Sequence, residues 1–173
     1  MNYEELGKEI YNTSNIQGEF LLRSGETSNE YFDKYLFESK PCLLSNISAQ
    51  MVNLLPKKFD KLAGLEMGGI PIATALSMKT SKEIIFVRKE AKKYGTCKVA
   101  EGGLIKGLNL VLIEDVITSG GAVIDAALEL RKEGAIIDTV VCVIDRESTG
   151  ESNLKKYGIE IKPLFTKSFL NSL

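Results

Sequence analysis

From residue 60 onward, short apolar runs alternate with stretches that have helical spacing. The runs have the length and β-branched content of buried strands, and between two of them residues 122–133 carry apolar side chains three and four positions apart. This rhythm predicts an α/β fold, namely a Rossmann-like open, mostly parallel five-stranded sheet with helices on both faces. We expect the strands at residues 61–65, 83–87, 109–113, 139–144 and 159–163.

The first third of the chain has a different pattern. Residues 2–14 show helical spacing, residues 18–35 predict two short strands joined by a polar turn, and Pro41 opens a second helix that extends to about residue 55. The short strands suit a small cap better than a core layer. We therefore expect one domain over residues 1–173, with 1–40 forming an N-terminal hood.

Polar and glycine-rich segments follow four of the predicted strands. Ligands of open α/β sheets bind along the edge where the parallel strands end. Because four such segments converge on that edge, they predict a site there. In chain order the segments are Glu66-Met67-Gly68-Gly69, Arg88-Lys89, Glu114-Asp115 with the turn that follows, and Asp145-Arg146.

Segment 111–122 joins an apolar strand, two acids, a small-residue turn and a helix start. The turn at residues 119–121 lets backbone N–H groups point into one concavity at a helix N-terminus, where an anion is stabilised. Glu114 and Asp115 can accept hydrogen bonds from sugar hydroxyls. Together these features predict a ribose 5-phosphate site. The plainer alternative is a strand-turn-helix connection in which the acids only cap the helix.

Two further segments have basic or glycine-rich character. Gly68-Gly69 would let backbone amides approach a second anion, plausibly a diphosphate, although a tight turn needs the same residues. Residues 88–103 form a basic stretch longer than the usual connection, which is typical of a lid. Its cations could neutralise a leaving diphosphate, whereas the alternative is a solvated charged loop.

Three side chains suggest a binding place for a flat, anionic ring. Arg146 offers a planar fork for a carboxylate or carbonyl pair, unless it forms a salt bridge with a neighbouring acid. Tyr31 and Phe32 could flank a ring, although aromatic pairs in short strands are often simple core.

Composition narrows the class of protein. A 44% hydrophobic and 26% charged content is that of an ordinary globular protein, and a net charge of −1 argues against a nucleic-acid partner. No apolar run is long enough for a membrane span, so we expect a cytoplasmic protein with no membrane partner. The three cysteines are expected to be reduced. The chain has no histidine, so its chemistry must use carboxylates, lysines, arginines, hydroxyls and backbone dipoles.

Segment 111–122 resembles the phosphoribosyl diphosphate (PRPP) signature of the type I phosphoribosyltransferases. Other segments, in the same order along the chain, resemble the orotate-specific members of that family. These segments are Gly18-Glu19-Phe20, Ser24-Gly25, Tyr31-Phe32-Asp33, residues 64–73, the lid from Arg88 through Lys92 with Tyr94-Gly95, and Asp145-Arg146.

The resemblance implies that PRPP and orotate give orotidine 5′-monophosphate and diphosphate, with Mg²⁺ held mainly by PRPP and with no direct metal ligand from the chain. It implies a homodimer in which the lid Lys89 serves the neighbouring subunit, and a hood that covers the base site. The implied catalytic residues are Lys89, Lys92 and Asp115. The implied PRPP-binding residues are Arg88, Lys89, Lys92, Tyr94, Glu114, Asp115, Val116, Ile117, Thr118, Ser119, Gly120, Gly121, Ala122, Gly68 and Gly69. The implied orotate-binding residues are Thr118, Arg146, Arg23, Tyr31 and Phe32.

The chain departs from the family pattern at three places. Arg23 stands where many members have lysine, Tyr94 where some have histidine, and Met67-Gly68 where some have Tyr-Lys. The last difference leaves the diphosphate pocket short of one cation. Two alternatives stay open, namely a phosphoribosyltransferase for another base and a PRPP-sensing regulator of the same fold.

Overall fold

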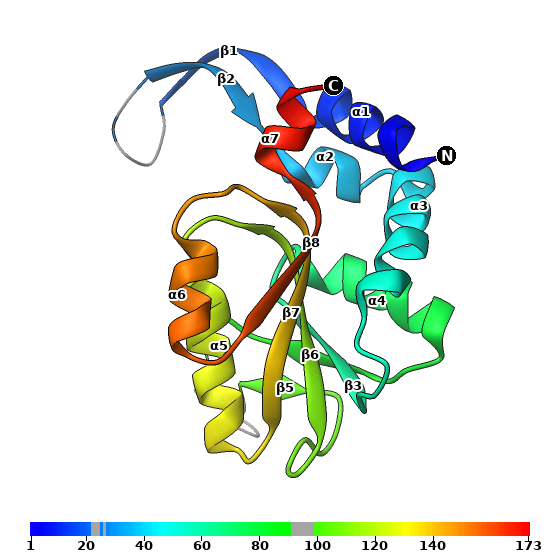
Figure 1. Ribbon diagram of the computed structural model, residues 1–173, viewed down its shortest axis with the longest axis vertical. Coiled ribbons are helices and arrows are strands. Elements are labelled where there is room, and N and C mark those ends of the chain that lie inside the picture. The colour runs from blue at the N-terminus through cyan, green and yellow to red at the C-terminus, as the bar shows by residue number, and fades with distance from the viewer. Residues whose placement is uncertain (22–24, 26, 91–98) are drawn as a thin grey trace.

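The computed structural model describes residues 1–21, 25, 27–90 and 99–173, and in them a central sheet lies between two layers of helices (Figure 1). The sheet has six strands in the order β5-β4-β3-β6-β7-β8, all parallel except β5, which pairs antiparallel with β4. The predicted fold class is therefore confirmed, with one strand more than the five expected.

The elements follow one another in the predicted alternation. The strands are β1 Asn15–Leu21, β2 Thr27–Phe32, β3 Lys61–Leu65, β4 Ile84–Val87, β5 Ala100–Glu101, β6 Asn109–Ile117, β7 Ile136–Asp145 and β8 Glu160–Thr166. The helices are α1 Tyr3–Ser14, α2 Lys34–Glu38, α3 Pro41–Met51, η1 Val52–Leu54, α4 Gly69–Thr80, α5 Gly121–Lys132, α6 Gly150–Lys156 and α7 Lys167–Asn171.

Alternation along the central strands explains the two layers. Leu110 and Leu112 of β6 pack in the cluster that includes α5, whereas Val111 and Ile113 pack in the cluster that includes α1, α3 and α4. Successive strand residues point to opposite faces, and here both faces are covered. This is why the sequence of these strands is continuously apolar and does not alternate between apolar and polar residues.

The hood is built from α1, the antiparallel pair β1 and β2, and α2, and the C-terminal α7 lies beside it (Figure 1). Leu6 and Ile10 of α1 and Phe37 of α2 are fully buried in the same cluster as Val111 of β6. Asn2 caps α1, because its side chain accepts from the Glu5 N–H at 2.9 Å while the Glu5 carboxylate accepts from the Asn2 N–H at 2.9 Å. The hood therefore shares its core with the sheet.

Several boundaries differ from the expectation. β6 and β7 are longer than predicted, so Glu114 and Asp115 lie within β6 and do not follow it. The helix expected over 41–55 ends at Met51 and continues as the short 3-10 turn η1. The two-residue β5 lies in the stretch that had been assigned wholly to the lid, and α2, α6 and α7 were not predicted.

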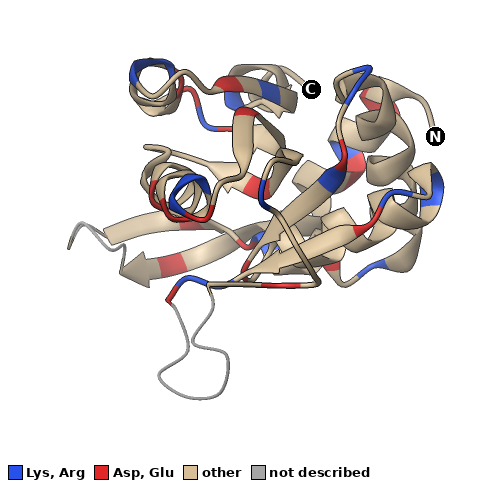
Figure 2. Ribbon diagram, turned by 90° about the horizontal axis from the view of Figure 1, so that it is seen from below, with Lys and Arg blue, Asp and Glu red and all other residues tan. Residues whose placement is uncertain are grey.

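Charged residues of both signs are spread over the molecule. Figure 2 shows Lys and Arg interspersed with Asp and Glu over the elements. Within the described part of the chain, no helix combines the length and the apolar character needed to cross a bilayer.

Candidate active site at the carboxyl edge of the sheet

The connection from β6 to α5 makes a sharp turn at Gly120. Gly120 has φ 76°, in the left-handed region, and an added Cβ would lie 3.1 Å from Cγ of Leu154. Both constraints favour glycine. No side chain of the described residues caps α5 at its N-cap, so the alternative in which the two acids cap this helix does not apply. The turn instead leaves the first amides of α5 open toward a cleft.

Helix α6 supports this turn from behind. The Asn153 side-chain amide donates to the Ser119 carbonyl at 3.0 Å, and an added Cβ on Gly150 would lie 2.8 Å from the Thr118 carbonyl oxygen. The close approach and the hydrogen bond fix the loop backbone. α6 therefore contributes to the site although no pattern in the sequence predicted it.

A first cleft, with a volume of about 590 Å³, opens in front of the β6–α5 loop. It brings together residues from three of the four predicted strand-end segments, namely Glu66, Arg88-Lys89 and Glu114 with the turn after it, whereas Arg146 of the fourth lines the second cleft. Its lining residues are Lys34, Leu65, Glu66, Val87, Arg88, Lys89, Val99, Glu114, Val116, Ile117, Thr118, Ser119, Gly120, Gly121, Ala122, Val123, Asp125, Ala126 and Glu129.

A second cleft, of about 710 Å³, lies between the sheet edge and the hood. It contains the residues assigned to the ring, namely Tyr31, Phe32, Thr118 and Arg146. The remaining lining residues are Tyr11, Asn15, Ser28, Glu30, Asp33, Lys34, Tyr35, Val116, Ile144, Lys167, Leu170 and Asn171. Lys34, Val116 and Thr118 line both clefts.

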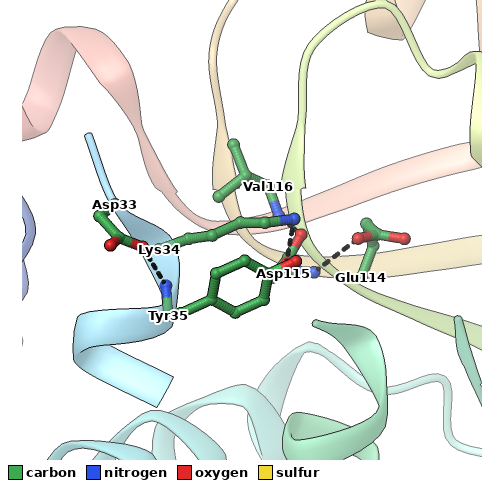
Figure 3. A network of polar contacts seen from close by, with 6 residues as sticks. All are labelled: Asp33, Lys34, Tyr35, Glu114, Asp115 and Val116. Carbon is green, nitrogen blue, oxygen red and sulfur yellow. Dashed lines mark hydrogen bonds and ion pairs between the residues drawn. The ribbon is translucent and has the colours of Figure 1, made fainter. Parts of the chain in front are cut away.

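The two acids of β6 point to opposite faces of the sheet. Glu114 continues the row of Leu110 and Leu112 toward α5, and Asp115 continues the opposite row toward the hood. Asp115 is fully buried, and its Oδ2 lies 2.5 Å from Nζ of Lys34 (Figure 3). Its Oδ1 accepts the Val116 N–H at 2.5 Å.

These contacts set the protonation of the acidic pair. Burial is the largest influence on the pKa of Asp115 and raises it, but hydrogen bonds from Glu114 and Lys34 outweigh it and hold the pKa below the ordinary value. Burial raises the pKa of Glu114 well above its ordinary value, and the neighbouring Asp115 adds to this. Within the pair the ionised form is therefore favoured on Asp115, which faces the Lys34 ammonium, and disfavoured on Glu114.

A third acid, Glu38 of α2, lies beside Asp115. It is buried, with 7% exposure, and burial followed by the charge of Asp115 raises its pKa to about 8. Glu38 is thus protonated at neutral pH. Neither Lys34 nor Glu38 was predicted from the sequence. The one local signal for them is that charged residues follow the aromatic pair Tyr31-Phe32.

Gly68 and Gly69 lie behind the acidic pair and are not on the wall of either cleft. An added Cβ on Gly68 would lie 1.5 Å from Oδ2 of Asp115, and one on Gly69 would lie 2.2 Å from the Ile113 carbonyl oxygen. Close packing of the α4 start against β6 therefore accounts for both glycines. Their assignment to a diphosphate stays a prediction, and the turn alternative has this packing to support it.

Arg146 is exposed on the wall of the second cleft. The neighbouring acids are engaged by backbone groups, because Asp145 accepts from the Glu147 N–H at 2.9 Å and Glu147 accepts from the Ser168 N–H at 2.5 Å. These bonds tie the end of β7 to α7. The guanidinium is thus available on the wall of the second cleft. This favours the prediction that Arg146 binds the ring over the alternative that it forms a salt bridge with a neighbouring acid.

The two aromatic residues of β2 are only partly covered. Tyr31 is exposed and packs against Phe20 with ring centroids 5.5 Å apart, whereas Phe32 is half-buried against Phe37 at 6.5 Å. Tyr31 therefore has a free surface on the cleft, and Phe32 combines a core role with a place on the cleft wall.

The described ends of the segment predicted to be a lid are held together. The Arg88 N–H donates to the Val99 carbonyl at 2.8 Å, and Val87 pairs with Ala100. Arg88 Nε lies 3.8 Å from Oε1 of Glu101. Arg88 and Lys89 line the first cleft, whereas the predicted site residues Arg23, Lys92 and Tyr94 lie outside the described residues.

Comparison with known proteins agrees with this geometry. A family model described as "Phosphoribosyl transferase domain" matches residues 43–169. The orotate phosphoribosyltransferase of a Nocardioides species is 51% identical over 167 residues, which cover 96% of this chain and 93% of the relative.

Solved structures show the same fold. The orotate phosphoribosyltransferase of Mycobacterium tuberculosis in complex with Fe(III) dicitrate has a TM-score of 0.88 at 23% identity, over 97% of this chain and 98% of that one. A structure of the same enzyme in complex with PRPP has a TM-score of 0.84 at 21% identity, over 98% of each chain.

Fold and domain match together define a type I phosphoribosyltransferase. Within that class, the 51% identity to the Nocardioides enzyme, over nearly the full length of both chains, identifies the narrower family. The chain belongs to the orotate phosphoribosyltransferase family.

Proposed function

We propose that the protein transfers the 5-phosphoribosyl group of PRPP to orotate, giving orotidine 5′-monophosphate and diphosphate in pyrimidine biosynthesis. One observation carries the proposal: a cleft with an anion-binding loop and a cleft with Arg146 and aromatic walls meet at Lys34, Val116 and Thr118. A phosphosugar in one and a flat anion in the other would bring the two reacting atoms together at that junction.

The roles of the chain's residues follow from their placement. Amides at the start of α5, with the Thr118 and Ser119 hydroxyls, would hold the 5-phosphate. Glu114 on the wall of the first cleft, and the ionised Asp115, which lies behind Lys34 and lines neither cleft, would accept hydrogen bonds from ribose hydroxyls and stabilise positive charge that develops on the ring as the bond to diphosphate breaks. Arg88 and Lys89 would balance the charge of the leaving diphosphate.

Base recognition falls to the second cleft. The Arg146 guanidinium offers two parallel donors to a carboxylate or a carbonyl pair, and Tyr31 offers a ring face. Orotate attacks as an anion, so no general base is required, in agreement with a chain that has no histidine. A neutral purine would leave the guanidinium without its partner.

Mg²⁺ completes the proposal as the partner of PRPP. The cleft chemistry fits a donor-bound ion, because oxygen ligands suit Mg²⁺ and the first cleft has carboxylates on its wall, including the exposed Glu66. Among the described residues no three His, Cys, Asp or Glu side chains come together as a metal-binding group. When bound, Mg²⁺ would neutralise part of the diphosphate charge.

A homodimer with a shared lid and a cytoplasmic location extend the proposal from the family resemblance. Mixing an Asp115→Asn variant with a Lys89→Ala variant tests the shared lid. If Lys89 serves the partner's site, the inactive pair regains activity on subunit exchange, whereas a lysine that serves its own subunit gives no recovery.

The function itself is tested by mixing pure protein, Mg²⁺ and PRPP with orotate, adenine, hypoxanthine or uracil and following ultraviolet absorbance. Conversion of orotate alone is expected. Conversion of another base in place of orotate would contradict the proposal, and binding of PRPP with no conversion of any base would favour the regulator alternative.

A further inference from the structure

Lys34 occupies a position that the resemblance does not assign. It is the first residue of α2, whose start is fixed because Asp33 accepts the Tyr35 N–H at 3.0 Å. From there its side chain reaches across to Asp115 (Figure 3). It lines both clefts, so its ammonium stands where the phosphosugar and the ring would meet.

The surroundings of Lys34 leave it one strong partner. Asp115 is ionised, whereas Glu38 and Glu114 have raised pKa values. The Lys34 ammonium also lies 5.3 Å from the Tyr35 ring centroid, a weaker attraction. Its side chain is 32% exposed, so the flexible stem can swing while the buried carboxylate stays in place.

Asp115 has a second use once the phosphosugar binds. Under the proposed function its carboxylate takes hydrogen bonds from ribose hydroxyls, which compete with the ammonium for the same oxygens. The donor also carries its diphosphate into the first cleft, whose wall includes Lys34 itself. An ammonium displaced from Asp115 therefore finds a stronger anion within reach.

We propose that Lys34 is a further substrate-contacting residue of this transferase. Its ammonium pairs with Asp115 before the donor binds and moves to the diphosphate oxygens when ribose hydroxyls occupy Asp115. This inference rests on the proposed function. It assigns to the hood a cation beside the bond that breaks, opposite Arg88 and Lys89, which approach from the end of β4.

Two simpler roles for Lys34 predict that its removal weakens the binding of different ligands. If Lys34 only neutralises Asp115, its removal harms every ligand that uses Asp115, with or without a diphosphate. If it binds the carboxylate of the base, its removal harms orotate alone. Ribose 5-phosphate carries the ribose and phosphate of PRPP but no diphosphate, so it separates these cases.

The test measures the Kd of PRPP and of ribose 5-phosphate by calorimetry, with Mg²⁺ and without a base, for wild type and Lys34→Gln. The PRPP Kd is expected to rise about tenfold, the order of one charge-assisted hydrogen bond. The Kd of ribose 5-phosphate is expected not to rise, because its hydroxyls no longer compete with an ammonium for Asp115. Lys34→Arg should recover part of the PRPP affinity.

Lys40→Gln is the matched control. Lys40 also belongs to the hood, is exposed, donates to Thr13 at 3.0 Å, and lies on neither cleft wall. It should leave both Kd values unchanged. Equal losses for the two ligands in Lys34→Gln, unchanged values for both, or an effect confined to the KM for orotate would each overturn the inference.

If Lys34→Gln does not fold, a crystal structure of the wild-type protein with PRPP and Mg²⁺ tests the same proposal. Lys34 Nζ is expected on a diphosphate oxygen, and an ammonium still on Asp115 would refute it. The PRPP and ribose 5-phosphate comparison does not involve the base. Failure to convert orotate would therefore defeat the proposed function without deciding the role of Lys34.

Discussion

The sheet side and the hood side of the site are built in different ways. On the sheet side, the end of β6, the turn at Gly120 and the start of α5 are consecutive in the chain. On the hood side, Lys34 and Glu38 reach Asp115 from a helix that is distant in sequence. The half of a site that is built from consecutive residues can be recognised from its sequence motif. The half that is assembled by packing of distant segments can be recognised only in the folded structure.

Asp115 belongs to both sides, so its loss should have the largest effect. Asp115→Asn removes the ionised acceptor for ribose hydroxyls and leaves Lys34 without its partner. We expect kcat/KM to fall by about 10²–10³-fold, as for other losses of transition-state charge stabilisation. The control is Asp138→Asn. Asp138 lies outside both clefts and accepts a hydrogen bond from the Thr139 hydroxyl, so this variant should retain activity. Steady-state kinetics at saturating orotate check this, and near wild-type rates in Asp115→Asn would remove it from the site.

Gly120→Ala tests the sheet side alone. The added methyl would sit at a positive φ and crowd Leu154, so we expect a loss of about 1–2 kcal/mol in unfolding free energy and a PRPP Kd raised at least tenfold. Gly107→Ala provides the comparison, because Gly107 has the same φ of 76° with nothing within 4 Å of the added Cβ. Denaturant unfolding measures the change in stability of each variant, and calorimetry measures its PRPP Kd. Equal PRPP affinity in both variants would mean that the turn does not hold the phosphate.

Glu38→Gln tests the hood side through pH. The folded pKa of about 8 exceeds the ordinary 4.5, so folding takes up a proton between these values. The stability this contributes is complete below pH 4.5 and is lost as pH rises through 8. Glutamine keeps a neutral donor at every pH. We therefore expect Glu38→Gln to match wild type at pH 5 and to exceed it by about 2 kcal/mol at pH 9.

Urea unfolding of both proteins across that pH range provides the measurement for Glu38. Glu30→Gln is the control, since it makes the same substitution at an exposed position of β2. A constant difference between wild type and Glu38→Gln at all pH values would show that Glu38 is ionised in the folded protein.

Asn153→Ala should give the smallest effect. It removes the 3.0 Å hydrogen bond to the Ser119 carbonyl, so the phosphate loop loses one support while its own sequence is intact. We expect about 1 kcal/mol less stability and a PRPP KM a few-fold higher. Ser152→Ala, on the same helix and bonded only to the Thr149 carbonyl, should change neither. An unchanged KM in Asn153→Ala would show that the loop holds its shape alone.

These contrasts explain what the sequence could and could not predict. The central strands β3, β6 and β7 were predictable because burial on both faces makes them largely apolar runs, and the loop at 119–121 because its glycines are consecutive with the strand end and the helix start. β5 was missed because a two-residue edge strand has no periodic pattern. Lys34 and Glu38 were missed because their place in the site depends on contact with Asp115. The assignment of Gly68 to a ligand stays a prediction, because close packing against Asp115 would require the same residue.

The shared wall of the two clefts has a consequence for inhibitor design. Since Lys34, Val116 and Thr118 border both, a bisubstrate compound that joins a phosphate-bearing sugar mimic to a flat acid would place its two halves in adjoining clefts. Linking the halves raises the effective concentration of the second once the first is bound. Such a compound would bind far more tightly than either fragment.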